Sequence, residues 1–213
     1  MAQFEGVQRS AVVRRGQWLT WLTLAYNSLE GILSVAAGAI AGSVALVGFG
    51  LDSFIEVTAS AAAIWRLRED ADTARRERAE RQALRVIAVT FFALSAYIAM
   101  DSLHDLVTQA APRSSKLGIA IAAASLVVMP LLASAKRRVA SRLRSDALRA
   151  EARQTDICMY LSALLLLGLT LNAALGWWWA DPASALLMTP LIAREGLETW
   201  RGRPPCCDDC ATP

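Results

Sequence analysis

The sequence lacks most of the features that an enzyme or a secreted protein carries. It contains no nucleophile motif, no phosphate-binding glycine loop and no nucleotide fingerprint. Only one residue is histidine, and the four cysteines show no pattern of a secreted disulfide framework. These absences leave an enzyme without support and argue against a small extracellular domain held together by disulfides.

Charged residues are sparse in six long apolar stretches, and hydrophobic residues make up 55% of the 213-residue chain. The mean hydropathy is +0.36. About 20 mostly apolar residues cross the hydrocarbon core of a bilayer as a helix. We therefore predict an all-α membrane protein, a six-transmembrane-helix bundle with spans at 18–41, 43–65, 84–108, 117–135, 157–179 and 182–200.

The basic residues predict the orientation of these spans. All but two of the 22 Lys and Arg residues fall on one side, the exceptions being Arg113 and Lys116. By the positive-inside rule both termini are expected in the cytoplasm, and the net charge of +3 needs no nucleic-acid partner. No A-x-A-like cleavage site follows the first apolar run, so we expect it to stay as an anchor.

The remaining segments are short. The connections 66–85 and 136–153 combine charge with good helix formers, which predicts solvated or headgroup-facing helical extensions. Gly42 and the Asp181-Pro182 pair indicate tight turns. We expect one membrane domain at 1–203 and a Cys/Asp-rich cytoplasmic tail at 204–213. The alanine- and arginine-rich composition favours a bacterial inner membrane.

Two carboxylates lie near the middle of the second predicted span. Asp52 and Glu56 are four residues apart, which places both on one helix face close to Ser53 and Ser60. A charge at the membrane centre costs about 3 kcal/mol on insertion scales, so an acidic pair there predicts a cation-binding site. The alternative is a carboxylate pair that shares one proton or is satisfied by neighbouring hydroxyl and amide groups.

Polar residues in other spans extend this candidate site. Asn27 and Glu30 share a face of the first span, where the alternative role is helix packing through hydrogen bonds. At the head of the fifth span either Glu151 or Asp156 can reach a site shared with the second. His104 lies between two acids at the outer end of the third span, where a solvated helix end is the simpler interpretation.

The tail contains three thiols and two carboxylates in five residues, CCDDC. Its cysteines stay reduced on the cytoplasmic side, and one C-x2-C spacing is present. These cysteines, Cys206, Cys207 and Cys210, are candidates for metal capture. The alternative is a disordered chain end.

Four segments resemble a known family: YNSLEG, GSVALVGFGLDSFIE, SDALRAEARQTD and GWWWADPASALL. Together they are similar to the membrane part of the cation diffusion facilitators, the cation efflux family of divalent-metal and proton antiporters. They follow the family's order at about its spacing over most of the chain. Asp52 and Glu56 fit the family's D-x-x-x-D pattern.

The resemblance implies that the acidic pair joins two ligands from the fifth span in a tetrahedral mid-membrane site, and that rocking of the bundle alternates access. The family's fifth-span motif, H-x-x-x-D or D-x-x-x-D, can be matched through either Glu151 or Asp156. A homodimer is implied as well. Only 13 residues follow Trp200, which implies a minimal form lacking the family's C-terminal cytoplasmic domain.

We therefore expect a divalent metal cation transporter rather than an enzyme. Zinc is the first expectation, with Mn, Fe or Co as alternatives, exported from the cytoplasm in exchange for protons and without an organic cofactor. The expected partners are metal, protons, membrane lipid and a second copy. The alternative is a non-transporting regulatory or metal-sensing membrane protein of the same fold. The predicted metal ligands are Asp52, Glu56, Glu151, Asp156, Glu30 and Asn27.

Overall fold

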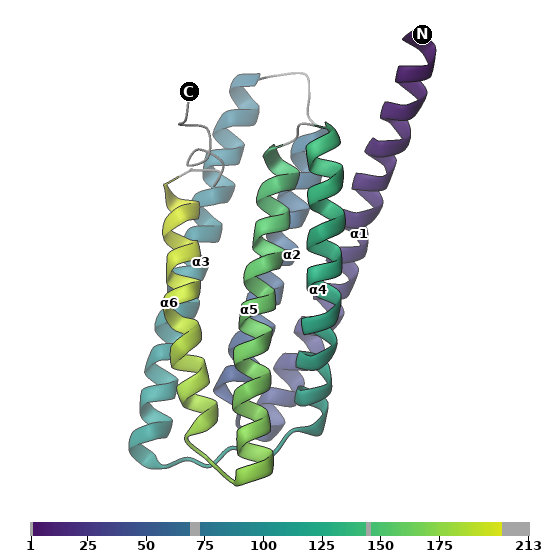
Figure 1. The fold of residues 1–213 in the computed structure, drawn as a ribbon. Coiled ribbons are helices and arrows are strands. Elements are labelled where there is room, and N and C mark those ends of the chain that lie inside the picture. The colour runs from purple at the N-terminus through teal and green to yellow at the C-terminus, as the bar shows by residue number, and fades with distance from the viewer. Residues whose placement is uncertain (1, 69–72, 144–145, 202–213) are drawn as a thin grey trace, which may run out of the picture.

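The computed structural model describes the backbone of residues 2–68, 73–143 and 146–201, with side chains from residue 14 onward except at 59, 62–83, 143–151 and 153. Within these ranges the chain forms six helices and no strand, arranged as a bundle that runs up and down (Figure 1). Their bounds are α1 Ala2–Ala41, α2 Val44–Arg68, α3 Thr73–Thr108, α4 Lys116–Leu143, α5 Asp146–Leu175 and α6 Ala180–Trp200.

These helices confirm the predicted all-α fold. Among the described residues four segments are long and apolar enough to cross a membrane by themselves, at Arg14–Ala41, Leu84–Thr108, Lys116–Arg142 and Gln154–Leu175. The other two helices, α2 and α6, carry acidic residues in or beside their apolar stretches. Both pack against several neighbours, since α2 contacts α1, α3, α5 and α6.

The connections differ from the prediction at one turn. Gly42 has a φ of 69°, a left-handed conformation that suits the turn predicted between the first two spans. The turn before α6 lies earlier than predicted, because α5 ends at Leu175 and Gly176 has a φ of 67°. Asp181 and Pro182 instead occupy the first turn of α6, where proline's missing N–H costs no helical hydrogen bond.

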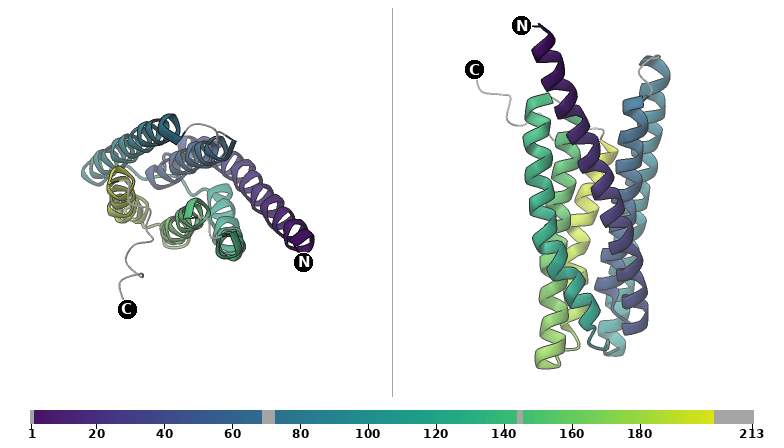
Figure 2. Two further views of the ribbon diagram at one scale, coloured as in Figure 1. Left: turned by 90° about the horizontal axis from the view of Figure 1, so that it is seen from above. Right: turned by 90° about the vertical axis from the view of Figure 1, so that its right-hand side faces the viewer.

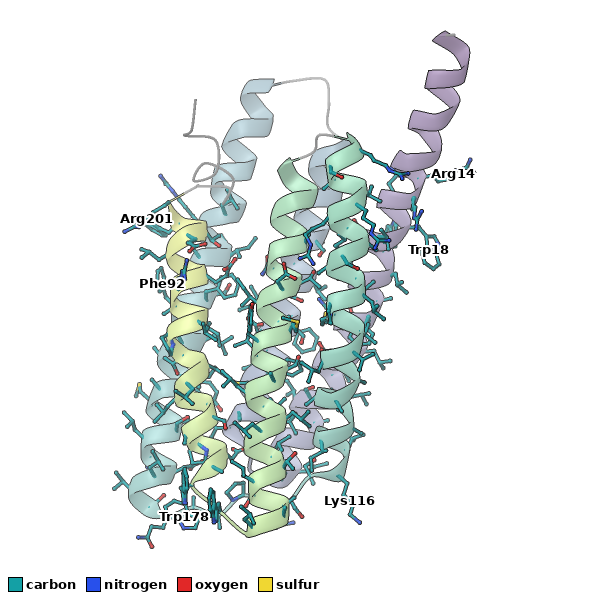
Figure 3. The ribbon with its side chains drawn as sticks, viewed as in Figure 1. Arg14, Trp18, Phe92, Lys116, Trp178 and Arg201 are labelled. Atoms are coloured by element: carbon teal, nitrogen blue, oxygen red, sulfur yellow. The ribbon has the colours of Figure 1, made fainter. Side chains whose placement is uncertain are left out.

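The two ends of the bundle differ as the positive-inside count predicts. Arg14 and Arg201 lie toward one end, and Lys116 and Trp178 lie at the other (Figure 3). Helix α2 ends and α3 begins at the end that carries Arg14, and so do the C-terminal end of α4 and the N-terminal end of α5 (Figure 1). We call this the arginine-rich end.

Glycines allow α1 and α2 to lie unusually close together. A Cβ atom on Gly50 would lie 2.8 Å from the backbone nitrogen of Val35, and one on Gly38 would lie 2.8 Å from that of Val47. On Gly31 it would lie 3.1 Å from the carbonyl oxygen of Gly50. This close approach of the two helices allows polar side chains of α1 to reach those of α2.

Candidate metal-binding site

The contact between α1 and α2 brings four predicted polar residues together. The amide Nδ2 of Asn27 donates a hydrogen bond to Glu56 Oε2 at 2.5 Å. The hydroxyl of Ser53 lies 3.1 Å from Glu30 Oε2. All four side chains are buried, with at most 4% of their surface exposed. A carboxylate from each helix is thus held by a neutral polar group of the other.

Each of these carboxylates keeps one oxygen without a protein partner. Among the described residues, Glu30 Oε1, Glu56 Oε1 and Asn27 Oδ1 are buried and accept no hydrogen bond. The hydroxyl of Ser34 is also buried and unpaired there, and the hydroxyls of Ser125 and Tyr26 lie close to Glu30. Since an unsatisfied buried polar group costs about 1–3 kcal/mol, such a concentration of acceptors indicates a site for a ligand.

Asp52 extends the acidic site toward α6. Its side chain is 4% exposed, and it lies close enough to Glu30 and Glu195 for their charges to interact. Glu195 was missed by the sequence analysis, because it follows the apolar stretch of the sixth span and resembles an ordinary charged helix end. The tertiary structure instead turns it toward the second helix.

A buried lysine lies near Glu56. Lys136 of α4 is 1% exposed, its Nζ donates a hydrogen bond to Thr155 Oγ1 at 3.3 Å, and its charge interacts with Glu56. The sequence analysis assigned Lys136 to the basic connection after the fourth span, since nothing in its neighbours distinguishes it from Arg137 and Arg138. The structure adds it to the site as an internal cation.

The fifth helix faces the site with residues other than its two predicted acids. Asp156 forms an ion pair with Arg137 of α4, where both side chains are partly exposed. Glu151 lies in α5, but its side chain is outside the described residues. Toward the site α5 presents Thr155 and Cys158, and the thiol of Cys158 lies within electrostatic range of Glu30, Asp52 and Glu56.

The described side chains do not form a finished metal site. No group of three or more His, Cys, Asp or Glu residues among them is arranged to hold a metal ion. His104 is exposed at the outer end of α3. The predicted tail ligands Cys206, Cys207 and Cys210 lie outside the described residues. The site therefore consists of buried acids on α1 and α2, with the partly buried Glu195 of α6 and the lysine of α4 beside them.

These features define the class of protein: an all-α, multi-pass membrane protein whose acidic residues gather inside the bundle. The cation efflux transmembrane domain matches residues 20–201, and the chain therefore belongs to the cation efflux family.

Two relatives are similar over much of the chain. It is 27% identical over 135 residues to transmembrane protein 163 of Xenopus laevis, which covers 63% of this chain and 48% of that protein. It is 28% identical over 160 residues to an uncharacterized transporter of Synechocystis sp., which covers 72% of this chain and 52% of that protein. The chain spans about half the length of these curated relatives.

The family match confirms the resemblance and the predicted fold class. It also supports an integral membrane location and cation transport rather than catalysis. The identity of the metal, proton exchange, the homodimer and the bacterial inner membrane stay predictions.

Proposed function

We propose that the chain transports a divalent metal cation, with zinc as the first choice and Mn, Fe or Co as alternatives. Export from the cytoplasm in exchange for protons is part of the proposal. Membership of the cation efflux family supports the transport of a cation. The observation that carries the proposal is the group of buried acceptors without partners, Asn27 Oδ1, Glu30 Oε1 and Glu56 Oε1, between α1 and α2.

The proposed ligands are oxygen donors in the first place. Asp52 and Glu56 supply carboxylates from one face of α2, and Glu30 and Asn27 supply a carboxylate and an amide from α1. The sequence-based candidates Glu151 and Asp156 are proposed as alternative donors from α5. Carboxylate and carbonyl oxygens discriminate weakly among transition metals, and for this reason Mn, Fe and Co remain in the proposal beside zinc.

Binding of the metal requires movement of the bundle. Because no three of the described donors are yet arranged around one point, the complete shell is proposed to form when α2 shifts against α5 or α6. Helix displacement of a few ångströms is the usual way in which transporters alternate access to a midplane site. In this proposal the state described above precedes metal capture.

Proton exchange follows from competition for the same oxygens. A carboxylate must be deprotonated to bind a metal ion, so metal affinity falls as the pH falls and metal binding releases protons. Protons from the more acidic side would thus displace the metal from Asp52 and Glu56. These carboxylates are sufficient to couple metal binding to proton release, and no other type of residue is required.

Lys136 has a proposed place in this cycle. In the absence of metal its ammonium group lies near Glu56 and offsets part of the negative charge of the acidic site. A divalent cation entering the site would add to that positive charge and repel the ammonium. Lys136 is thus proposed to weaken metal binding enough for release.

Uptake into proteoliposomes tests the proposal. The purified chain is reconstituted and Zn, Mn, Co and Fe(II) are supplied with and without a pH gradient, in parallel with Asp52→Asn and with the outer-end control Asp105→Asn. Gradient-dependent uptake that is absent only from Asp52→Asn is the expected result. No uptake of any of the four metals by folded protein would reject transport.

A regulatory or metal-sensing role is the second candidate, and two observations favour it. Asp156 pairs with Arg137, and the described donors form no three-residue metal cluster. A protein that senses metal without moving it would bind metal to the purified chain, lose that binding in Asp52→Asn, and give no uptake in the same liposomes. Equilibrium metal binding measured beside the flux therefore separates the two candidates.

A further inference from the structure

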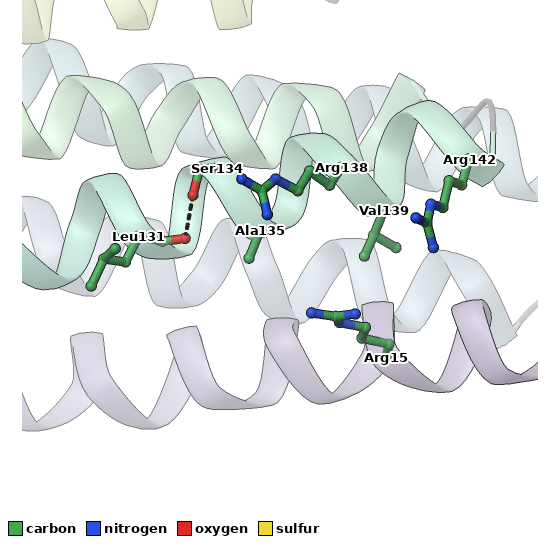
Figure 4. A pocket seen from close by; sticks show the side chains of 7 residues that line it. All are labelled: Arg15, Leu131, Ser134, Ala135, Arg138, Val139 and Arg142. Carbon is green, nitrogen blue, oxygen red and sulfur yellow. Dashed lines mark hydrogen bonds between the residues drawn. The ribbon is translucent and has the colours of Figure 1, made fainter.

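A cleft separate from the acidic site lies between α1 and α4, toward the arginine-rich end. Its volume is about 530 Å³, and both helices line it. Arg15 of α1 and Arg138 and Arg142 of α4 line its polar part, and Leu131 and Val139 of α4 line its apolar part (Figure 4). The N-terminal part of α1 diverges from the rest of the bundle at this end (Figure 2).

The three guanidinium groups form a cluster of one sign. Within the described part of the chain, none of them forms an ion pair or a side-chain hydrogen bond, whereas Arg137 and Arg194 are paired with Asp156 and Glu198. Three neighbouring positive groups repel one another unless an anion lies between them. Guanidinium groups also match the paired oxygens of a phosphate.

The depth of the cleft in the membrane indicates which kind of anion could bind there. Trp18, 66% exposed, follows Arg15 by one turn of α1, and exposed tryptophans of membrane helices mark the interface with water. Leu131, 65% exposed, lies two turns before Arg138 on α4, toward the middle of that span. The cleft thus runs from the headgroup level into the hydrocarbon region, on the side predicted to face the cytoplasm.

We propose that this cleft binds one anionic phospholipid of the cytoplasmic leaflet. Its phosphate lies among Arg15, Arg138 and Arg142, and an acyl chain follows Val139 and Leu131. A soluble phosphate would satisfy the charge and leave the apolar wall uncovered, and a neutral phospholipid would cover the wall and leave the guanidinium cluster without an excess of negative charge. An anionic lipid meets both requirements, and basic pockets between membrane helices bind such headgroups.

Lipid binding to the purified full chain tests this proposal. The protein in detergent is titrated with short-chain phosphatidylglycerol or phosphatidylcholine, and the bound lipid is counted by native mass spectrometry. The test variant is Arg138→Gln with Arg142→Gln. The matched control is Arg85→Gln with Arg201→Gln, which removes the same charge from exposed residues near the same end of α3 and at the end of α6.

Phosphatidylglycerol is expected to bind the wild type and the control alike and to bind the test variant about 25-fold more weakly, since each of the two basic residues near the surface contributes roughly fivefold. Three outcomes would overturn the proposal. They are equal binding of phosphatidylcholine, an equal loss in the control pair, and displacement of the lipid by inorganic phosphate at the same concentration. Size-exclusion profiles of the wild type and both double variants check that folding and oligomeric state are unchanged.

Discussion

Two buried acidic regions of this protein differ in how their oxygens are used. At the end of the bundle opposite the arginine-rich end, Asp181 is fully buried and both of its oxygens have partners. Its Oδ1 accepts a hydrogen bond from Ser43 Oγ at 2.6 Å, and its Oδ2 lies 3.5 Å from the backbone nitrogen of Ala45. In the interior, Glu30 and Glu56 each leave one oxygen without a partner among the described residues.

This difference distinguishes an acid with a structural role from acids that we propose to bind a ligand. Asp181 lies at the N-terminus of α2, where Ser43 Oγ also accepts the backbone N–H of Leu46 at 3.1 Å. A carboxylate there satisfies donors that the first helical turn leaves free and interacts favourably with the helix dipole. Glu30 and Glu56 satisfy no helix end and keep free acceptor oxygens. Burial alone therefore does not distinguish a structural acid from a proposed ligand, and the unused oxygens of Glu30 and Glu56 are what make these two acids candidates.

The strongest test of this comparison replaces one acid of the interior. Asp52→Asn keeps the size of the side chain but removes a charge that a divalent cation needs, and we expect transport to fall at least about a hundredfold. The melting temperature in detergent should change little, because the substitution also removes the repulsion from Glu30 and Glu195. Metal uptake and thermal unfolding measured on the same preparation check both parts. Wild-type flux would remove Asp52 from the mechanism.

The opposite result is expected at the outer end. Asp181→Ala leaves the hydroxyl of Ser43 and the N–H of Ala45 without their acceptor, which should lower the free energy of unfolding by about 2 kcal/mol. Transport per folded molecule should stay near the wild-type value. Unfolding in detergent measures the free energy of unfolding, and flux normalised to folded protein measures the transport per folded molecule. A loss of transport without a loss of stability would place Asp181 with the binding acids.

The contribution of α5 can be resolved with three matched variants. If Glu151 or Asp156 completes the metal shell, then Glu151→Gln or Asp156→Asn should reduce transport about tenfold, as expected for one ligand of several. Arg137→Gln breaks the ion pair with Asp156 and should change transport less than about twofold, because partly exposed pairs contribute little. If all three variants reduce transport equally and only slightly, neither Glu151 nor Asp156 is a metal ligand.

A fourth prediction concerns the buried Lys136. Lys136→Met keeps the length of the side chain and removes its charge, so the apparent affinity for metal should rise about fivefold as repulsion is lost. The maximal transport rate should fall, because release becomes slower. Equilibrium metal binding and initial rates of uptake separate these effects. Lys136→Arg, which keeps the charge, should remain closer to the wild type in both.

Much of the fold could be predicted from the sequence. Apolar runs and charged connections predicted the helices, because length and hydropathy are local properties of the chain; their orientation in the membrane stays a prediction. The errors occurred where local signals were weak. The fifth helix ends at Leu175 instead of residue 179, since a tryptophan-rich turn is as apolar as a span.

The candidate site was predictable in part. The i, i+4 spacing of Asp52 and Glu56 and the acid and amide of α1 stand out because polar residues are rare inside spans. Lys136 and Glu195 could not be recognised, since each belongs to a charged segment that resembles an ordinary helix end. Only packing reveals that the side chain of Lys136 turns inward while those of its neighbours Arg137 and Arg138 remain exposed.

By itself the sequence determined that this chain forms six helices, that charge collects at one end, and that acids lie within the first two spans. These properties follow from composition and period within single segments. The tertiary structure decided which acids have partners and which keep free oxygens. That decision depends on contacts between distant segments, such as the one joining Ser43 to Asp181 across 138 residues, and no pattern within one helix specifies them.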